Sequence, residues 1–165
     1  MRSNRDLAAL DVAHLLHPAT SITALEAGGP RLIDSASGVY ITDSEGRRVI
    51  DGMAGLWCVA MGHGRDSLAD AMSTAARKLD YYHGFTGFSH APQILLAERL
   101  VALANASLGA DTFSHVFFGS GGSDCNDSLL KIVWHYNHVL GRPEKRKILS
   151  RIQGYHGVTV AATSL

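Results

Sequence analysis

The pattern of apolar and polar positions predicts a strand, a glycine-rich turn and a helix between residues 115 and 141. Residues 116–118, Val-Phe-Phe, form a short apolar run that suits a buried strand. The next five residues, 119–123, read Gly-Ser-Gly-Gly-Ser and can continue neither a strand nor a helix. Apolar side chains then recur at helical spacing up to Gly141, and Pro143 sets the end of that helix. These side chains are Leu129, Val133, Tyr136 and Leu140.

The same spacing predicts helices over residues 6–16 and 66–79, and another that starts near Pro92. Residues 31–51 have the pattern of an antiparallel hairpin, because two β-rich segments flank residues 43–46, Asp-Ser-Glu-Gly. Aspartate first and glycine last are typical of a tight turn. The hairpin stands apart from the α/β pattern that follows it.

A second strand and turn appear near the end of the chain. Residues 145–150 contain a short apolar segment, and the glycine-broken turn 153–157 follows it. The order strand, helix, strand, turn and helix predicts an α/β fold with a parallel sheet. Turns that follow parallel strands share one sheet edge, where ligands bind. We therefore expect residues 119–123 and 153–157 to lie together.

The first of these turns has the features of an anion site. A helix N-terminus presents unpaired backbone amides and a partial positive charge, and glycines allow an anion to approach closely. The plain alternative is a strand-to-helix turn in which Ser123 caps the helix and Asp124 lies in its first turn. The turn matches neither the Walker A motif nor the dinucleotide fingerprint.

Composition narrows the class of protein. The formal net charge is zero, with 46% hydrophobic and 18% charged residues, as in soluble globular proteins. No basic stripe is present, so nucleic acid is not an expected partner. No export signal or membrane-spanning run is evident, and we expect a cytoplasmic protein without a metal site. The two cysteines, Cys58 and Cys125, are expected to be free thiols.

Seven segments in order give the chain a resemblance to the N-terminal part of class III (ω-type) aminotransferases, which depend on pyridoxal 5'-phosphate. The chain is most similar to the pyruvate-dependent branch that acts on ω-amino acids and amines, such as the GABA–pyruvate and β-alanine–pyruvate transaminases, and residues 131–137 and 140–143 resemble the GABA–pyruvate type in particular. The seven segments are residues 16–18 (LHP), 38–46 (GVYITDSEG), 51–57 (DGMAGLW), 62–65 (GHGR), 97–100 (AERL), 117–131 and 154–157 (GYHG).

This resemblance implies the type I fold of pyridoxal-phosphate-dependent transferases, in partial form. Residues 1–52 would be an N-terminal helix and hairpin segment belonging to the small domain. Residues 53–165 would be the first part of the cofactor-binding large domain, truncated at its C-terminus. Family members are homodimers with active sites at the subunit interface, so the resemblance also implies a homodimer.

The resemblance also assigns roles to individual residues. Ser120, Gly121, Gly122 and Ser123 would form the cup for the cofactor phosphate. Family members usually have Ser-Gly-Ser where this chain has residues 121–123, so a hydroxyl is missing at Gly121. Tyr155 would stack on the pyridine ring, with His156 and Gly157 beside it in the same turn. Trp57 and Phe85, together with Tyr155, would line the substrate pocket.

The implied activity is transfer of an amino group from an amine or ω-amino acid to pyruvate or a similar 2-oxo acid. An aminomutase or a decarboxylase of the same family is the alternative, as is a non-catalytic remnant. The family's Schiff-base lysine lies beyond residue 165, because none of the four lysines here has its sequence context. The chain thus contains no catalytic residue, only cofactor-binding and substrate-binding ones.

We therefore predict that the isolated 165-residue chain does not turn over substrate, because a transaminase needs that lysine to bind the cofactor covalently and to move the proton. The measurement is the absorbance spectrum of the chain with cofactor, before and after an amine donor is added. A cofactor band that shifts on addition of the donor would contradict the prediction.

Overall fold

A computed structural model describes residues 2–165, and the contacts divide the chain into two units, Met1–Tyr82 and His83–Leu165. The expected boundary between domains, at residues 52 and 53, concerns the complete family fold and stays a prediction.

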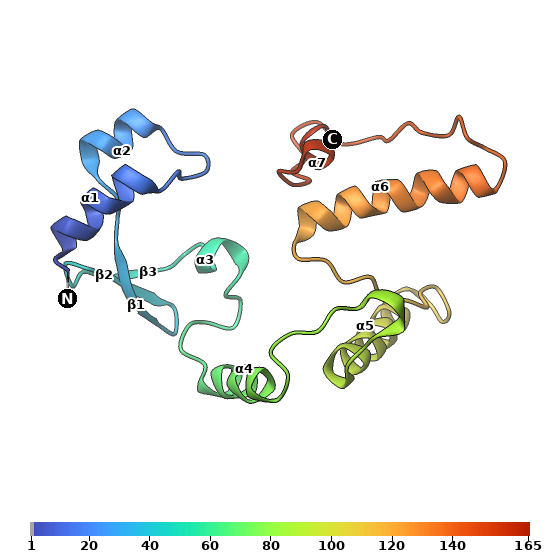
Figure 1. The fold of residues 1–165 in the computed structure, drawn as a ribbon, viewed down its shortest axis with the longest axis horizontal. Coiled ribbons are helices and arrows are strands. Elements are labelled where there is room, and N and C mark those ends of the chain that lie inside the picture. The colour runs from blue at the N-terminus through green and yellow to red at the C-terminus, as the bar shows by residue number, and fades with distance from the viewer. Residues whose placement is uncertain (1) are drawn as a thin grey trace. The chain divides into compact units, whose positions relative to one another are not determined.

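Three short antiparallel strands organise the first unit (Figure 1). They are β1 (Ile33–Ser37), β2 (Tyr40–Asp43) and β3 (Arg48–Ile50), paired in the order β1-β2-β3. The Asp43 carbonyl accepts a hydrogen bond from the Gly46 amide at 2.9 Å and closes the turn between β2 and β3. The Asp43 carboxylate also accepts hydrogen bonds from two turn amides. The structure thus confirms the hairpin predicted for residues 31–51, to which β1 adds a third strand.

The helices of the first unit follow local capping signals. Helix α1 is fixed by reciprocal bonds between Ser3 and Asp6, since each side chain pairs with the other's backbone amide. It starts and ends two residues earlier than the prediction of 6–16. Helix α2 was not predicted, because seven residues are too few to show a helical period, although Ser21 caps it. The helices are α1 (Asn4–His14), α2 (Ile22–Gly28), α3 (Ala54–Trp57) and α4 (Asp66–Lys78).

The second unit contains two long helices. Helix α5 has Pro92 in its first turn, as predicted, and α6 begins in the glycine-rich turn and ends before Gly141. Figure 1 shows the chain after α6 returning alongside it, so that α7 lies beside the first turns of α6. The elements are the 3₁₀ turn η1 (Phe85–Gly87), α5 (Ala91–Leu108), α6 (Gly122–Val139) and α7 (Val160–Thr163).

The two parallel strands predicted at 116–118 and 145–150 are not formed. Both segments lie outside the sheet, and the side chains of Phe117 and Leu149 are 65% and 94% exposed. A strand of a parallel sheet needs a hydrogen-bonded neighbour on at least one side. Within residues 2–165 neither segment has such a neighbour, so the apolar runs remain without a sheet to join.

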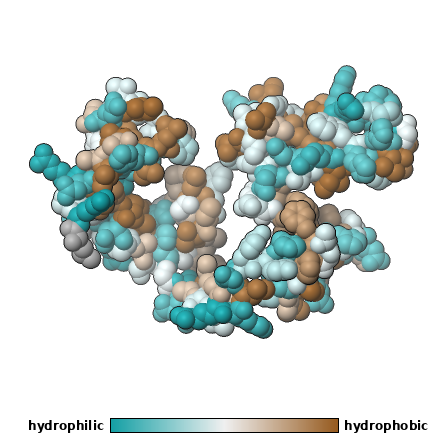
Figure 2. All heavy atoms as spheres, in the orientation of Figure 1, coloured by the Kyte–Doolittle hydropathy of each residue, from teal (hydrophilic) through white to brown (hydrophobic). Residues whose placement is uncertain are grey.

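Little apolar surface is buried. Among the described residues the buried apolar side chains are Leu130 of α6 and Ala162 of α7, and Asn137 is buried with them. In Figure 2 hydrophobic residues are visible on the surface of both units. In the described part of the chain, no helix is both long and apolar enough to cross a membrane.

Candidate functional site

The glycine-rich turn leads into α6 through a carboxylate. The Asp124 side chain accepts hydrogen bonds from the Ser120 amide at 2.9 Å and the Gly121 amide at 2.7 Å. These two bonds lower the pKa of Asp124 from its ordinary value of 3.8, because they favour the ionised form. Gly121, and not Ser123, is therefore the N-cap of the helix. The alternative in which Ser123 caps the helix is therefore wrong in its cap residue, although Asp124 does lie in the first turn and accepts the hydrogen bonds there.

Two amides of the first turn of α6 remain available. Within residues 2–165 no protein group accepts a hydrogen bond from the amide of Gly122 or of Ser123. Amides at this position have no partner inside the helix and carry the positive end of its dipole. The backbone geometry therefore suits a bound anion, and a carboxylate of the chain itself already occupies the neighbouring pair of amides.

The second predicted turn docks onto the same end of α6. The Ser123 hydroxyl oxygen accepts a hydrogen bond from the Val158 amide at 3.0 Å. The Asn126 side-chain amide donates to the carbonyl oxygen of His156 at 2.6 Å. These bonds join segments 30 and 35 residues apart in the sequence. The structure thus brings the turns 119–123 and 153–157 together, as expected, even though the parallel sheet is not formed.

An aspartate on α6 continues this docking into α7. One carboxylate oxygen of Asp127 accepts hydrogen bonds from the Thr159 hydroxyl at 2.7 Å and the Ala162 amide at 3.0 Å. Sequence reasoning missed the roles of Asn126 and Asp127. A signal was present, because residues three and four positions after Ser123 share its face of the helix.

Gly157 permits the close approach of the two segments. Its φ is +131°, a region that side-chain-bearing residues rarely adopt. A Cβ atom there would lie 2.8 Å from the Cα atom of Ser123. A glycine is thus required at this position on two independent grounds, the backbone angle and the space.

The other predicted site residues differ in exposure. The Nε2 atom of His156 is buried, and among the described residues it has no hydrogen-bond partner. Tyr155, beside it, is 76% exposed, and Phe85 in η1 is 79% exposed. Trp57 belongs to the first unit and is 81% exposed, at the end of α3. The aromatic side chains predicted to contact ligands are therefore largely exposed, and the Phe85 ring has the His83 ring at a centroid distance of 6.2 Å.

No group of three or more possible metal ligands gathers anywhere among residues 2–165. His17 pairs with Asp11, with 2.8 Å between Nε2 and Oδ1.

Comparison with proteins of known structure identifies the class. An omega transaminase from Pseudomonas jessenii, solved in complex with PMP, superimposes with a TM-score of 0.89 at 39% identity, over 96% of this chain and 34% of that one. A transaminase from the marine bacterium Virgibacillus gives a TM-score of 0.90 at 42% identity, over 97% of this chain and 35% of the other. The fold is therefore part of that of the pyridoxal-phosphate-dependent transaminases, which confirms the expected fold class.

Sequence comparison names the family. The model of the class III aminotransferases matches residues 24–165, and the chain belongs to that family. It is 41% identical to the diaminobutyrate–2-oxoglutarate transaminase of Halomonas elongata, over 100% of this chain and 34% of that protein. It is 42% identical to the putrescine–pyruvate aminotransferase of Pseudomonas aeruginosa, over 98% and 34% of the two chains. The chain thus spans about a third of the length of these relatives.

Pyridoxal phosphate is the cofactor of this family, and the residues present fit its phosphate group. Two first-turn amides have no acceptor among residues 2–165, the Ser123 hydroxyl lies between the two turns, and the lack of a side chain at Gly157 lets the second turn reach Ser123. The ligand roles of the individual residues remain predictions.

Replacement of Gly157 by alanine tests the docking of the turns. We expect Gly157→Ala to separate residues 157 and 158 from Ser123, because the new Cβ overlaps that residue and the positive φ is unfavourable. Hydrogen exchange of the Val158 amide should become roughly 10- to 100-fold faster, matching a cost of about 1–3 kcal/mol. Gly122→Ala is the matched control, since a Cβ there meets nothing within 4 Å. Equal exchange rates in the two variants would contradict the docking.

Proposed function

We propose that residues 120–123 and 155–157 hold pyridoxal phosphate in an aminotransferase that moves an amino group from an amine or ω-amino acid to pyruvate or a similar 2-oxo acid. The observation that carries this proposal is the docking of the second turn on the first turn of α6, through Ser123 and Asn126. Docking gathers the glycine-rich amides, a hydroxyl and the aromatic turn at one helix N-terminus, which suits a phosphorylated aromatic ligand.

The phosphate would bind at the amides of Gly122 and Ser123. Their partial positive charge favours a dianion, while the Asp124 carboxylate beside them opposes it. The side-chain hydroxyl missing at Gly121 leaves the cup with one donor fewer than its usual family form. We therefore expect phosphate binding that is present but weaker than in a cup with Ser-Gly-Ser.

The remaining residues would orient the ligand. When bound, the cofactor supplies an electron-withdrawing ring that stabilises negative charge on the substrate carbon. Tyr155 would cover one face of that ring, with His156 supporting it from the same turn. The family resemblance gives Trp57 and Phe85 the role of residues that contact the amine, and each side chain is highly exposed within its own unit.

The relatives guide the choice of substrates. The names of the two relatives contain putrescine and diaminobutyrate, and both compounds carry an amino group at the end of a carbon chain. This favours a terminal amine as the amino donor. One relative is named for pyruvate and the other for 2-oxoglutarate as acceptor, and the resemblance of segment 131–143 favours pyruvate. We further propose a cytoplasmic homodimer in which residues 1–52 belong to the small domain and 53–165 to the large domain.

Restoring the missing hydroxyl tests the phosphate cup. Gly121 has a φ of −165°, which any residue adopts, and a Cβ there would meet Asp124 at an ordinary 3.6 Å. We expect Gly121→Ser to bind pyridoxamine phosphate roughly fivefold more tightly, as one added hydrogen bond allows. Calorimetry measures the affinity, and this amine form of the cofactor does not react with lysines.

Pyridoxamine without its phosphate is the control ligand, and Gly121→Ser should not improve its binding. If pyridoxamine binds as tightly as its phosphate to the parent chain, the turn is not a phosphate cup and the proposed function loses its support.

A further inference from the structure

A carboxylate and an imidazole close the two ends of the loop that carries Trp57. Both ends are fixed by backbone bonds to the two residues that precede β2, in the turn between β1 and β2. The Asp51 amide donates to the Val39 carbonyl at 2.9 Å, and Gly38 and His63 exchange two backbone bonds of 3.0 and 2.8 Å. Asp51 and His63 are therefore held side by side, although twelve positions separate them.

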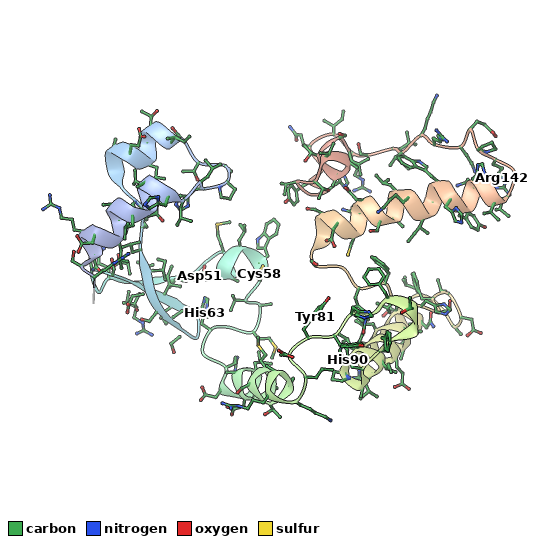
Figure 3. All side chains as sticks on the ribbon, viewed as in Figure 1. Asp51, Cys58, His63, Tyr81, His90 and Arg142 are labelled. Carbon is green, nitrogen blue, oxygen red and sulfur yellow. The ribbon has the colours of Figure 1, made fainter. Side chains whose placement is uncertain are left out.

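The side chains of these residues are bonded to each other. His63 Nε2 lies 2.9 Å from Asp51 Oδ2, with only 21% and 12% of the two side chains exposed (Figure 3). The same Asp51 oxygen accepts a hydrogen bond from the Gly55 amide at 2.7 Å. One carboxylate oxygen thus connects the beginning, the turn and the end of the loop, and we call this three-residue contact the Asp51 clasp.

The clasp supports an unusual turn. Ala54, Gly55, Leu56 and Trp57 all have positive φ, between 47° and 66°. Three of the four carry side chains, and such residues adopt the left-handed conformation singly and at a cost. A run of this kind persists only where surrounding contacts hold it, and the Gly55 amide that Asp51 binds lies inside the run.

The direction of the Trp57 ring depends on that turn. The Trp57 backbone is tied within the turn, by a 2.8 Å bond from its amide to the Met53 carbonyl. Its side chain is 81% exposed and so has little packing of its own to hold it. The backbone therefore sets the position and direction of the Cα–Cβ bond from which the indole extends, and the clasp contacts that backbone at Gly55.

We propose that Asp51 and His63 are positioning residues, which fix Trp57 and thereby set the size of amine that the pocket admits. The effect on amine size rests on the proposed function, because it requires Trp57 to line the substrate pocket. The hydrogen bond from His63, and then that from Gly55, lower the pKa of Asp51, so the carboxylate stays ionised and the clasp closed at neutral pH.

A second aspartate–histidine pair provides a matched control. Asp11 and His17 pair at 2.8 Å in the same unit, near the end of α1, and their hydrogen bond leaves the Trp57 turn untouched. Replacing the histidine of either pair removes one imidazole–carboxylate hydrogen bond of similar length. Only loss of the Asp51 clasp should alter Trp57.

The experiment uses the 165-residue chain with Trp134→Phe, which leaves Trp57 as the single tryptophan. We expect His63→Ala and Asp51→Ala to lower the fluorescence anisotropy of Trp57, with the larger loss in Asp51→Ala. Hydrogen exchange of the Gly55 amide should become roughly tenfold faster in Asp51→Ala, as loss of a bond to a charged acceptor predicts. His17→Ala should change neither signal.

The state of the β-sheet shows whether a substitution displaces Trp57 alone or unfolds the unit. Exchange of the β2 and β3 amides reports the sheet, and Asp51→Asn keeps the side-chain volume while removing the charge. Loss of Trp57 order with a protected sheet supports the proposal. Three results would overturn it. The first is a Trp57 anisotropy and a Gly55 exchange rate that do not change in Asp51→Ala, and the second is an equal change of both signals in His17→Ala. The third is loss of β2 and β3 protection in Asp51→Asn as well as in Asp51→Ala. No cofactor or amine is present, so this test is independent of whether the phosphate cup binds its ligand.

Discussion

The contact between Ser123 and the 157–158 segment is the constraint on which the candidate site depends. The hydroxyl of Ser123 accepts a bond from Val158, and Gly157 allows the two backbones to approach so closely that no side chain would fit. Asn126 and Asp127 add bonds from the next turn of the same helix face. These hydrogen bonds need only the two segments that they join. They therefore bring together two turns that are far apart in the sequence, although few apolar side chains are buried.

The longer helices and the hairpin could be predicted because their signals are local. The meeting of the two turns was predicted from a parallel sheet that is not formed, and polar contacts bring the turns together instead. Helical spacing located α4, α5 and α6, and the Asp43 to Gly46 turn located the hairpin. Local signals could not show whether the strands expected at 116–118 and 145–150 would form. An apolar run indicates that a segment can pair, but pairing requires a neighbour, and within the described residues neither run has one.

The site was predicted less completely than the fold. Glycine and serine in the first turn indicated an anion site, but the sequence did not show that Asp124 would occupy two of its amides. A serine and an aspartate near a helix start are both good caps, and propensity alone does not choose between them. The role of Asp51 was missed for a related reason, since its partners His63 and Gly55 are joined to it only by the folded loop.

The chain matches about a third of each relative's length, yet superimposes closely on the solved transaminases over nearly all of its own residues. Its contribution to catalysis would be to bind and orient, through a phosphate cup, an aromatic turn and a tryptophan held by a clasp. The chemistry that uses these elements would require the lysine that the family resemblance places beyond residue 165.

The most direct test of the central claim is an amide NMR titration of the isotope-labelled chain with pyridoxamine phosphate. The account predicts shifts concentrated at residues 120–124 and 155–158, with the largest at the free amides of Gly122 and Ser123. Shifts that miss both turns, or that appear equally with phosphate-free pyridoxamine, would contradict it.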